Sequence, residues 1–371
     1  MSGVSALGSW PGTDIRACVR FVRDVFAGDP GDGAWSLPYL PELPDRGPGA
    51  ELVGRSAAFL VGLPVDLQPS GWRIVDRPGR DAGRTAAYLR QDLDEMAEAY
   101  DGYDGPLKLQ VAGPWTLAAN VRVGRGERAV VDPGAARDVC QSLAEGLSEH
   151  LRTVASLVPG ARLVVQLDEP SLPAVLAGHL PTSSGFGTHR AVDPETVERG
   201  LRTVIETVRR QLREGGAAGE ADGRRDHLAA PGPQESPEAG APRILDPRHP
   251  DVAVHCCAPD VPIALLRSAG VAAVSLDASL LDPSGWESVA VTVEAGVGLW
   301  AGLPLEPQAG ALAAAELLVR NWCELGLPLS RLDGVVVTPT CGLAGSSPPR
   351  ARAIHKLAAD AARALTEMAG E

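Results

Sequence analysis

The chain has 371 residues, of which 44% are hydrophobic and 22% charged, so it carries enough apolar residues to bury a core. Global disorder is therefore not expected. The formal net charge of −13 argues against a nucleic-acid-binding protein, because such proteins normally present a basic face. The length is typical of a single α/β barrel with insertions.

No apolar run reaches the roughly 18 residues that a membrane span needs. The first ten residues lack the charged start and the long apolar stretch of a signal peptide. We therefore expect a cytoplasmic protein without membrane contact. The 6 cysteines are too few in a chain of this length for a disulfide framework. Three of them fall in helix-like contexts and are expected to be buried free thiols, namely Cys18, Cys140 and Cys323.

Short β-rich runs alternate with longer helical patterns along the chain. The predicted strands cover residues 4–7, 107–111, 162–167, 252–255, 271–276, 297–301 and 334–337. The predicted helices cover residues 84–99, 133–154, 194–213, 312–325 and 350–369. Alternation of this kind predicts a parallel sheet covered by helices.

An eighth strand is expected in the apolar stretch 57–65, although that stretch could equally form a helix. Eight strands would close a single (β/α)8 TIM barrel over residues 1–371, with its active site at the C-terminal ends of the strands. Residues 214–250 are rich in Gly, Ala, Pro and charge, and they predict a low-complexity surface insertion within this one domain. The Pro- and Gly-rich stretch 29–55 is predicted to be a long loop.

Polar clusters follow six of the predicted strands. They are Gly8-Ser9, Gly113-Pro114-Trp115-Thr116, Asp168-Glu169, His255-Cys256-Cys257, Asp277-Ala278-Ser279 and Thr338-Pro339-Thr340-Cys341-Gly342. Because the carboxyl ends of parallel strands meet on one rim, six clusters in this position predict a single site.

A zinc ion is the best explanation of the histidine and the late cysteines. His255 and Cys257 are two residues apart, so their side chains point to one face of a strand end, while Cys256 points to the other. Cys341 comes from another strand end. One imidazole and two thiolates suit zinc, and catalytic zinc sites keep a further position open. The alternative is that these are small buried cysteines beside a core histidine.

Carboxylates at two other strand ends each allow two interpretations. Asp277 is either a further metal ligand or an ordinary acceptor, such as a helix N-cap. In Asp168-Glu169 the two carboxylates point in different directions, so one can bind a substrate ammonium group while the other forms a structural pair. The alternative for this pair is a helix-capping acid. At the first strand, Ser9 can offer a hydroxyl to a substrate carboxylate.

Taken in chain order, the motifs resemble those of one family, the catalytic C-terminal barrel of cobalamin-independent methionine synthase. That family shares its fold with uroporphyrinogen decarboxylase. The matching segments are Leu7-Gly8-Ser9-Trp10-Pro11, Gly113-Pro114-Trp115-Thr116, Asp168-Glu169-Pro170, His255-Cys256-Cys257 and Cys341-Gly342-Leu343. Each is short, but five in the family's order over nearly the whole chain are specific.

The resemblance implies a zinc ion held by His255, Cys257, Cys341 and a fourth ligand. The family has a glutamate as that ligand, and this chain has Asp277 in its place. The implied reaction is the transfer of a methyl group to the thiol of homocysteine, which forms methionine. The methyl donor would be 5-methyltetrahydrofolate or a corrinoid protein.

The resemblance also implies the residues that bind the two substrates. Homocysteine would lie against Leu7, Ser9 and Asp168, and Asp168 with Glu169 would serve catalysis. Trp115 is a candidate for a flat ligand, although core packing explains it equally well. Asn120 stands where the family has a tryptophan that contacts the folate. For the proton that a folate leaving group needs, the candidates are Glu42 and His189.

Two other classes of function stay open. A uroporphyrinogen decarboxylase-like enzyme would use the same barrel without metal and would need an arginine-lined cleft, for which Arg46 and Arg55 are the candidates. A non-catalytic zinc-binding barrel would have its metal closed by a fourth strong ligand, so that no thiol substrate could bind.

Overall fold

The computed structural model describes residues 1–27, 33–124, 126–223 and 251–370. Of the predicted insertion 214–250, residues 214–223 continue a helix, and residues 224–250 lie outside the described part of the chain. None of the described helices is long and apolar enough to span a membrane.

Eight parallel strands form one curled sheet with the order β2-β1-β10-β9-β8-β7-β6-β5. The strands are β1 (Gly3–Val4), β2 (Trp35–Ser36), β5 (Pro106–Ala112), β6 (Arg162–Asp168), β7 (Val252–Cys256), β8 (Ala273–Asp277), β9 (Gly298–Leu303) and β10 (Val336–Pro339). A separate antiparallel hairpin is made of β3 (Val65–Gln68) and β4 (Gly71–Ile74). All seven strands that the sequence predicts are present, although the first ends at Val4.

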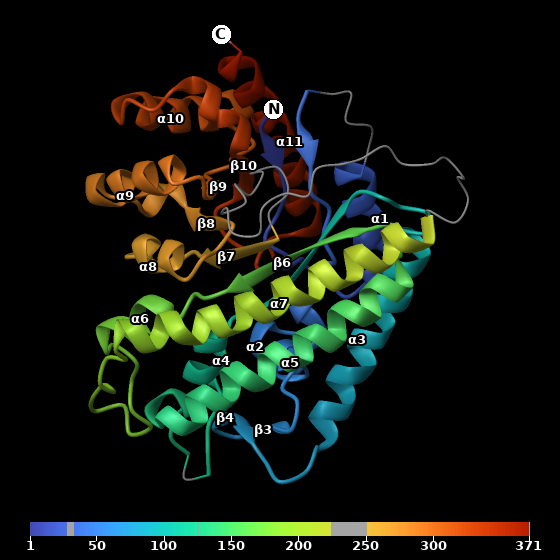
Figure 1. The fold of residues 1–371 in the computed structure, drawn as a ribbon, viewed down its shortest axis with the longest axis vertical. Helices are drawn as coiled ribbons and strands as arrows, with labels where there is room; N and C mark the ends of the chain where they lie inside the picture. Colours follow the sequence, from blue (N-terminus) through green and yellow to red (C-terminus); the bar gives the residue numbers. More distant parts are fainter. Residues whose placement is uncertain (28–32, 125, 224–250, 371) are drawn as a thin grey trace, which may run out of the picture.

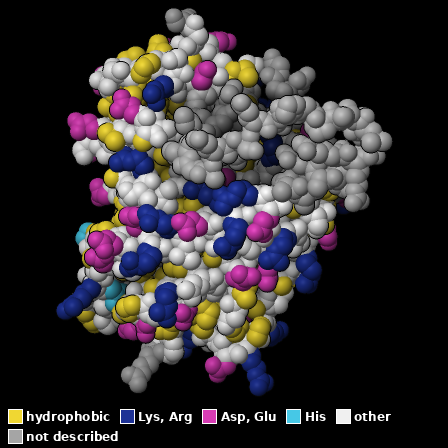
Figure 2. Space-filling view, viewed as in Figure 1, with side chains coloured by type: hydrophobic (Ala, Val, Ile, Leu, Met, Phe, Trp, Pro, Cys, Tyr) yellow, Lys and Arg dark blue, Asp and Glu magenta, His cyan; other side chains and the backbone are white. Residues whose placement is uncertain are grey.

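Helices flank the sheet, with α5 and α7 side by side across the front in Figure 1. They are α1 (Ile15–Phe26), α2 (Leu52–Ala57), α3 (Arg80–Ala99), α4 (Pro114–Asn120), α5 (Pro133–Leu157), α6 (Leu172–Ala177), α7 (Pro194–Gly223), α8 (Ile263–Ser268), α9 (Pro283–Glu294), α10 (Gly310–Glu324) and α11 (Pro348–Ala369). The five predicted helices are all confirmed. On the face shown in Figure 2, basic and acidic side chains are interspersed. On α7, Arg202 forms an ion pair with Glu198.

The prediction of the eighth strand was wrong in its place. Residues 57–65 hold the end of α2 and a turn, whereas the strand beside β1 is β2, inside the stretch predicted as a loop. The Trp35 N–H donates to the Ser2 carbonyl (3.1 Å), and the indole covers Gly3, where a side chain would collide with it. A strand of two residues has no periodicity of its own, so only the pairing with β1 selects it.

The sheet is TIM-like, but among the described residues no strand ladder closes it into a barrel. Between the segment after β2 and β5, the described chain forms a parallel bridge, Tyr39 with Lys108. Two backbone hydrogen bonds make this bridge, from the Lys108 N–H to the Pro38 carbonyl (2.8 Å) and from the Leu40 N–H to the Lys108 carbonyl (3.1 Å). The architecture is therefore a curled, helix-flanked parallel sheet whose edges touch at one point.

A small core cluster lies apart from the main one. It consists of Leu37, Val164, Ala253, Ala273, Trp300 and Val336, all fully or almost fully buried. Lys108 is level with Val164 in the register of β5 and β6 and is itself fully buried. Its Nζ donates to Gln166 Oε1 (2.7 Å) and lies 5.2 Å from the centre of the Tyr39 ring. Burial lowers the pKa of Lys108 to about 7, because a low-dielectric interior disfavours its charged form.

The helix α11 is attached to the segment after β2 by a buried histidine. His355 Nε2 lies 2.6 Å from the Tyr39 hydroxyl, and Nδ1 lies 2.7 Å from the Ala351 carbonyl oxygen. Burial lowers the pKa of His355 from 6.5 to about 4. The unfolded chain therefore binds a proton that the folded chain excludes, and the stability that the neutral ring provides is lost as pH falls through this range.

We predict that lowering the pH from 7 to 5 reduces the free energy of unfolding by about 2 kcal/mol through His355 alone. His355→Gln keeps a hydrogen-bonding side chain but cannot be protonated, so its stability should depend less on pH by this amount. Urea denaturation at both pH values measures the difference. His179→Gln, which removes an exposed histidine, is the control and should keep the wild-type dependence. Equal pH dependence in the two variants would contradict the prediction.

Candidate functional site

The register of three neighbouring strands sets several predicted site residues at one level. Ala112 at the end of β5 pairs with Asp168 at the end of β6, and Asp168 pairs with His255 on β7. His255 in turn pairs with Ser275 on β8. These ends form one rim of the sheet, as the parallel arrangement predicts.

Two cysteines from separate strand ends meet at this rim. Cys257 follows β7 and Cys341 follows β10, and their Sγ atoms lie 3.4 Å apart although β8 and β9 separate the two strands in the sheet. The hydrogen bond between the two thiols lowers the pKa of Cys341 to about 6 and raises the pKa of Cys257. Cys256, the neighbour of Cys257, is fully buried on the other side of the strand.

His255 lies on β7, two residues before Cys257, and its imidazole ring is held in a fixed orientation. It is 5% exposed, and its Nδ1 lies 3.0 Å from the Ser275 hydroxyl. Burial, with a further contribution from Lys108, lowers the pKa of His255 to about 3. The ring is therefore neutral near pH 7, which is the form that binds metal ions.

Asp277 adopts the N-cap arrangement. Its Oδ1 accepts hydrogen bonds from the Ser279 backbone N–H (2.9 Å) and the Ser279 hydroxyl (2.6 Å), at the start of a short 3₁₀ turn. Within the described residues, no group of three or more His, Cys, Asp and Glu side chains is arranged to hold a metal ion. Of the four predicted ligands, the structure brings Cys257 and Cys341 into contact.

Asp168 is almost buried, with 7% of its surface exposed, and is oriented by the side chain of Gln166. Gln166 Nε2 donates to Asp168 Oδ1 (2.7 Å) and to the Leu7 carbonyl oxygen (2.9 Å), so it links the end of β1 to the end of β6. Burial raises the pKa of Asp168, nearby Glu42 raises it further, and Lys108 opposes this rise.

Glu42 is a second buried carboxyl group at the rim. It is 3% exposed. Its backbone N–H donates to the Gly8 carbonyl (3.0 Å), within the strand-one motif, the residues 7–11 that follow β1. Arg55 Nε lies 3.5 Å from Glu42 Oε1, and burial raises the pKa of the carboxyl group. The sequence pointed to Glu42 only as a candidate proton donor. Its position at the rim follows from the parallel bridge between Glu42 and Ser9, which forms only in the folded chain.

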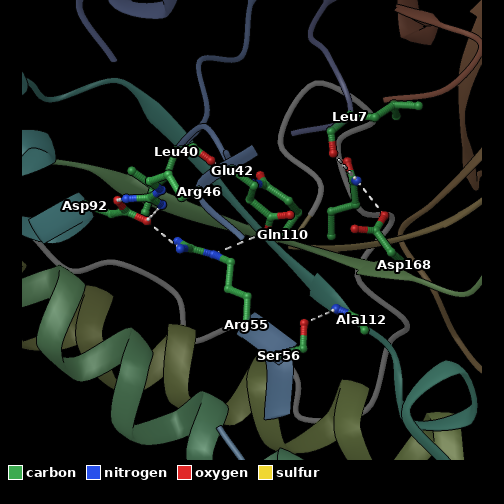
Figure 3. A network of polar contacts seen from close by, with 11 residues as sticks. Leu7, Leu40, Glu42, Arg46, Arg55, Ser56, Asp92, Gln110, Ala112 and Asp168 are labelled. Carbon is green, nitrogen blue, oxygen red and sulfur yellow. Dashed lines mark hydrogen bonds and ion pairs between the residues drawn. The ribbon is translucent and has the colours of Figure 1, made fainter. Parts of the chain in front are cut away.

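The two arginines that a uroporphyrinogen decarboxylase-like cleft would need are engaged elsewhere. Arg46 donates to both carboxylate oxygens of Asp92 (2.7 and 2.9 Å), and Arg55 donates to the same carboxylate (Figure 3). Asp92 on α3 is fully buried. Both guanidinium groups thus neutralise a core carboxylate, which leaves this alternative without its expected cation cluster.

Glu169 takes the helix-capping role that the sequence left open as the alternative. It is fully buried, and its carboxylate accepts hydrogen bonds from the Trp115 N–H (2.9 Å), the Thr116 N–H (2.7 Å) and the Thr116 hydroxyl (2.7 Å). It therefore caps the first turn of α4. Gly113 makes room for this, because a side chain there would collide with the Glu169 carboxylate.

The two residues predicted on the donor side lie on α4. Trp115 is 1% exposed, and its indole N–H donates to the Val197 carbonyl (2.9 Å), as core packing requires. Asn120 is half-buried, and its Nδ2 donates to the Thr116 carbonyl and to the Ser171 hydroxyl. His189 lies further along the chain, with Nε2 3.5 Å from Glu127 Oε2.

Ser9 lies directly beside the turn that carries Cys341. The Leu343 N–H donates to the Ser9 carbonyl (3.0 Å), and a side chain at Gly342 would collide with the Ser9 hydroxyl. Leu7, two residues earlier, is buried and takes part through its carbonyl bond to Gln166. The strand-one motif, the thiol pair and Asp168 therefore belong to one neighbourhood.

Comparison with known proteins shows a distant similarity to a solved structure. No family model matches the chain, and no curated protein matches it. Among solved structures, it is similar to a B12-independent methionine synthase from Shewanella sp. W3-18-1 in complex with selenomethionine. The identity is 13%, the match covers 82% of this chain and 74% of the other, and the TM-score is 0.41. A similarity at this level does not establish a family or an activity for the chain.

The glycine at the start of the strand-one motif predicts a measurable cost on substitution. Gly8 has φ +123°, and a Cβ there would lie 2.6 Å from the Gln110 side chain. Gly12 has φ +90° but nothing within 4 Å of the same position. Gly12→Ala should therefore cost about 1 kcal/mol from backbone strain alone, and Gly8→Ala about 3 kcal/mol because overpacking adds to the strain. Chemical denaturation checks this, and equal losses would contradict the predicted collision with Gln110.

Proposed function

We propose that this protein is a zinc-dependent methyltransferase that moves a methyl group from a donor to the thiol of homocysteine and forms methionine. The observation that carries the proposal is the pair Cys257 and Cys341, two thiols from separate strand ends that meet 3.4 Å apart at the rim. Two further residues support it: the neutral, anchored His255 on β7, two residues before Cys257, and the buried Asp168 that pairs with His255.

The chemistry of these side chains fits zinc. Two thiolates bound to one tetrahedral zinc, with bonds of about 2.3 Å, lie roughly 3.8 Å apart, so the two thiols need to separate by only a few tenths of an ångström. The Ser275 hydroxyl on His255 Nδ1 is the kind of outer contact that orients a histidine ligand. Asp277 would have to leave Ser279 to serve as a fourth ligand, whereas an open fourth position is what a thiol substrate requires.

When bound, zinc would lower the pKa of the homocysteine thiol, so that the thiolate is available near neutral pH. The chain itself holds the rest of the substrate. Asp168, oriented by Gln166, would bind the ammonium group, and the Ser9 hydroxyl would bind the carboxylate. Both contacts fix the direction from which the thiolate approaches the methyl group.

In the transfer, a bond forms between the homocysteine sulfur and the methyl carbon, and the bond from that carbon to the donor breaks. A folate donor leaves through a nitrogen that must gain a proton. Of the two proton-donor candidates, we favour Glu42, because it lies at the rim beside Gly8 and its burial favours the protonated form. Because the Glu169 carboxylate is hydrogen-bonded to the first turn of α4, we assign it a structural role, which is to fix α4 against the end of β6.

The metal half of the proposal predicts about one zinc per chain in purified protein. Cys341→Ser should lose most of that zinc, because serine is a poor zinc ligand. Cys323→Ser, which replaces an exposed free thiol on α10, is the matched control and should keep it. Elemental analysis measures all three proteins. Unchanged zinc in Cys341→Ser would overturn the ligand assignment.

The methyl-transfer half predicts methionine from homocysteine when 5-methyltetrahydrofolate and methylcobalamin are supplied in parallel reactions. Asp168→Asn should lower kcat/KM for homocysteine by at least about tenfold, mainly through KM, because it removes a charge-assisted contact to the ammonium group. Mass spectrometry of methionine provides the rate.

A non-catalytic zinc protein would give a different result. X-ray absorption of the zinc should show an added sulfur ligand when homocysteine binds to the enzyme and no change in a closed site. No methionine with either donor, together with an unchanged zinc spectrum, would overturn the proposed activity.

A further inference from the structure

Three arginines lie in a row outside the rim site. Arg73 on β4 forms a parallel bridge with Arg122, and Arg122 forms an antiparallel bridge with Arg128. The hydrogen bonds from the Ile74 N–H to the Arg122 carbonyl and from the Arg122 N–H to the Trp72 carbonyl, both 2.9 Å, hold the first pair in register. Directly paired residues on adjacent strands project to the same face with Cβ atoms roughly 5 Å apart, so the three arginine side chains leave the backbone on one face.

Among the described residues, these three cations form no ion pair with a carboxylate. Within the described part of the chain, no Asp or Glu oxygen lies within 4.0 Å of their guanidinium nitrogens. Asp66 is opposite Arg73 in the hairpin, but its carboxylate accepts the Asp81 N–H. Like charges placed directly opposite each other are destabilising, and the chain as a whole carries a net charge of −13, so a row of three arginines without an ion pair is unusual for it.

Backbone contacts hold two of the guanidinium groups in place. Arg122 donates through Nε to the Ser70 carbonyl (2.7 Å), and through Nη1 to the Gly126 carbonyl (2.6 Å) and the Ser183 hydroxyl (2.9 Å). Arg128 donates to the carbonyl oxygens of Ala119 and Pro181. Burial and the neighbouring Arg122 lower the pKa of Arg128, and the nearby carboxylate of Glu127 opposes this change.

Arg73 differs from the other two. Its Nε is buried and has no hydrogen-bond partner in the described structure. A buried N–H without an acceptor costs free energy, and a guanidinium group beside two fixed ones is the geometry that binds multivalent oxyanions. If these arginines only held the surrounding backbone in place, the contacts of Arg122 and Arg128 would be sufficient. That role does not explain the Nε of Arg73, which is buried and unpartnered among the described residues.

We propose that Arg73, Arg122 and Arg128 form an anion subsite that takes a polyanionic group of a ligand, made of several carboxylates or phosphates. The helix α4 runs from the rim to Arg122 and has 7 residues, which is a length of about 10 Å. A ligand anchored at the arginine row could therefore extend its other end to the rim. This subsite rests on its own contacts and does not depend on the reaction at the rim.

Isothermal titration of the full chain with tripolyphosphate and with citrate tests the subsite. Either probe should bind once per chain, and more weakly as salt is raised. Arg73→Gln should weaken binding about tenfold, because it removes one charge-assisted contact while leaving the loop hydrogen bonds in place. Arg20→Gln, which makes the same charge change in an exposed ion pair on α1, should stay within about twofold of wild type.

The two probes separate the sources of the anion. Tighter binding of tripolyphosphate supports a phosphate-bearing ligand, and tighter binding of citrate supports a carboxylate-bearing one. The proposal is overturned if neither probe binds at about 10 mM, or if Arg73→Gln binds as Arg20→Gln does. Thermal melting of both variants shows that they are folded. Absence of methyl transfer would leave this result standing, because the titration uses no methyl donor and no homocysteine.

Discussion

The level register of β5, β6, β7 and β8 is the constraint on which the rest of the site depends. Because Asp168 pairs with His255 and His255 with Ser275, the polar residues that end these strands stand side by side rather than staggered. The curl of the sheet then brings the end of β10 back toward β7, which places Cys341 against Cys257. In a flat sheet with the same strand order, the width of β8 and β9 would hold these two thiols apart.

Buried charge is the cost of this arrangement. Lys108, Glu42 and Asp168 all lie almost entirely out of solvent, and burial shifts the pKa of each toward its neutral form. A folded chain retains such groups only when they are paired, hydrogen-bonded or needed for function. Gln166 joins two of them, because its side chain accepts from Lys108 and donates to Asp168. The polar centre of the sheet is thus connected to the rim by one continuous chain of hydrogen bonds.

Adjacent residues with the same chemistry have taken separate tasks. Asp168 lies at the rim and is held by Gln166, whereas the buried Glu169 points toward α4 and caps its first turn. The alternation of side chains along a strand separates them, and Gly113 allows the close approach of the second carboxylate to the helix. A similar division holds for Cys256, which is in the core, and Cys257, which is at the rim.

The sequence by itself determined the elements with a strong local pattern and the positions of the polar clusters. Long amphipathic runs such as α5 and apolar runs such as β6 specify their own structure through periodicity and length. Because parallel strands end on one side, it also followed that Ser9, Asp168, His255 and Cys341 belong to one rim.

Only the tertiary structure decided the features that depend on distant partners. The strand β2 has two residues and exists through its pairing with β1. Segments that no local pattern relates meet in the contact of Cys257 with Cys341 and in the row of Arg73, Arg122 and Arg128. For Asp277, the local sequence left a metal ligand and an N-cap equally open, and the fold shows the N-cap. The physical reason is the same in each case. These interactions are selected by how the sheet curls and how the loops pack, and the free energy of a single contact is too small to appear as a pattern in the surrounding residues.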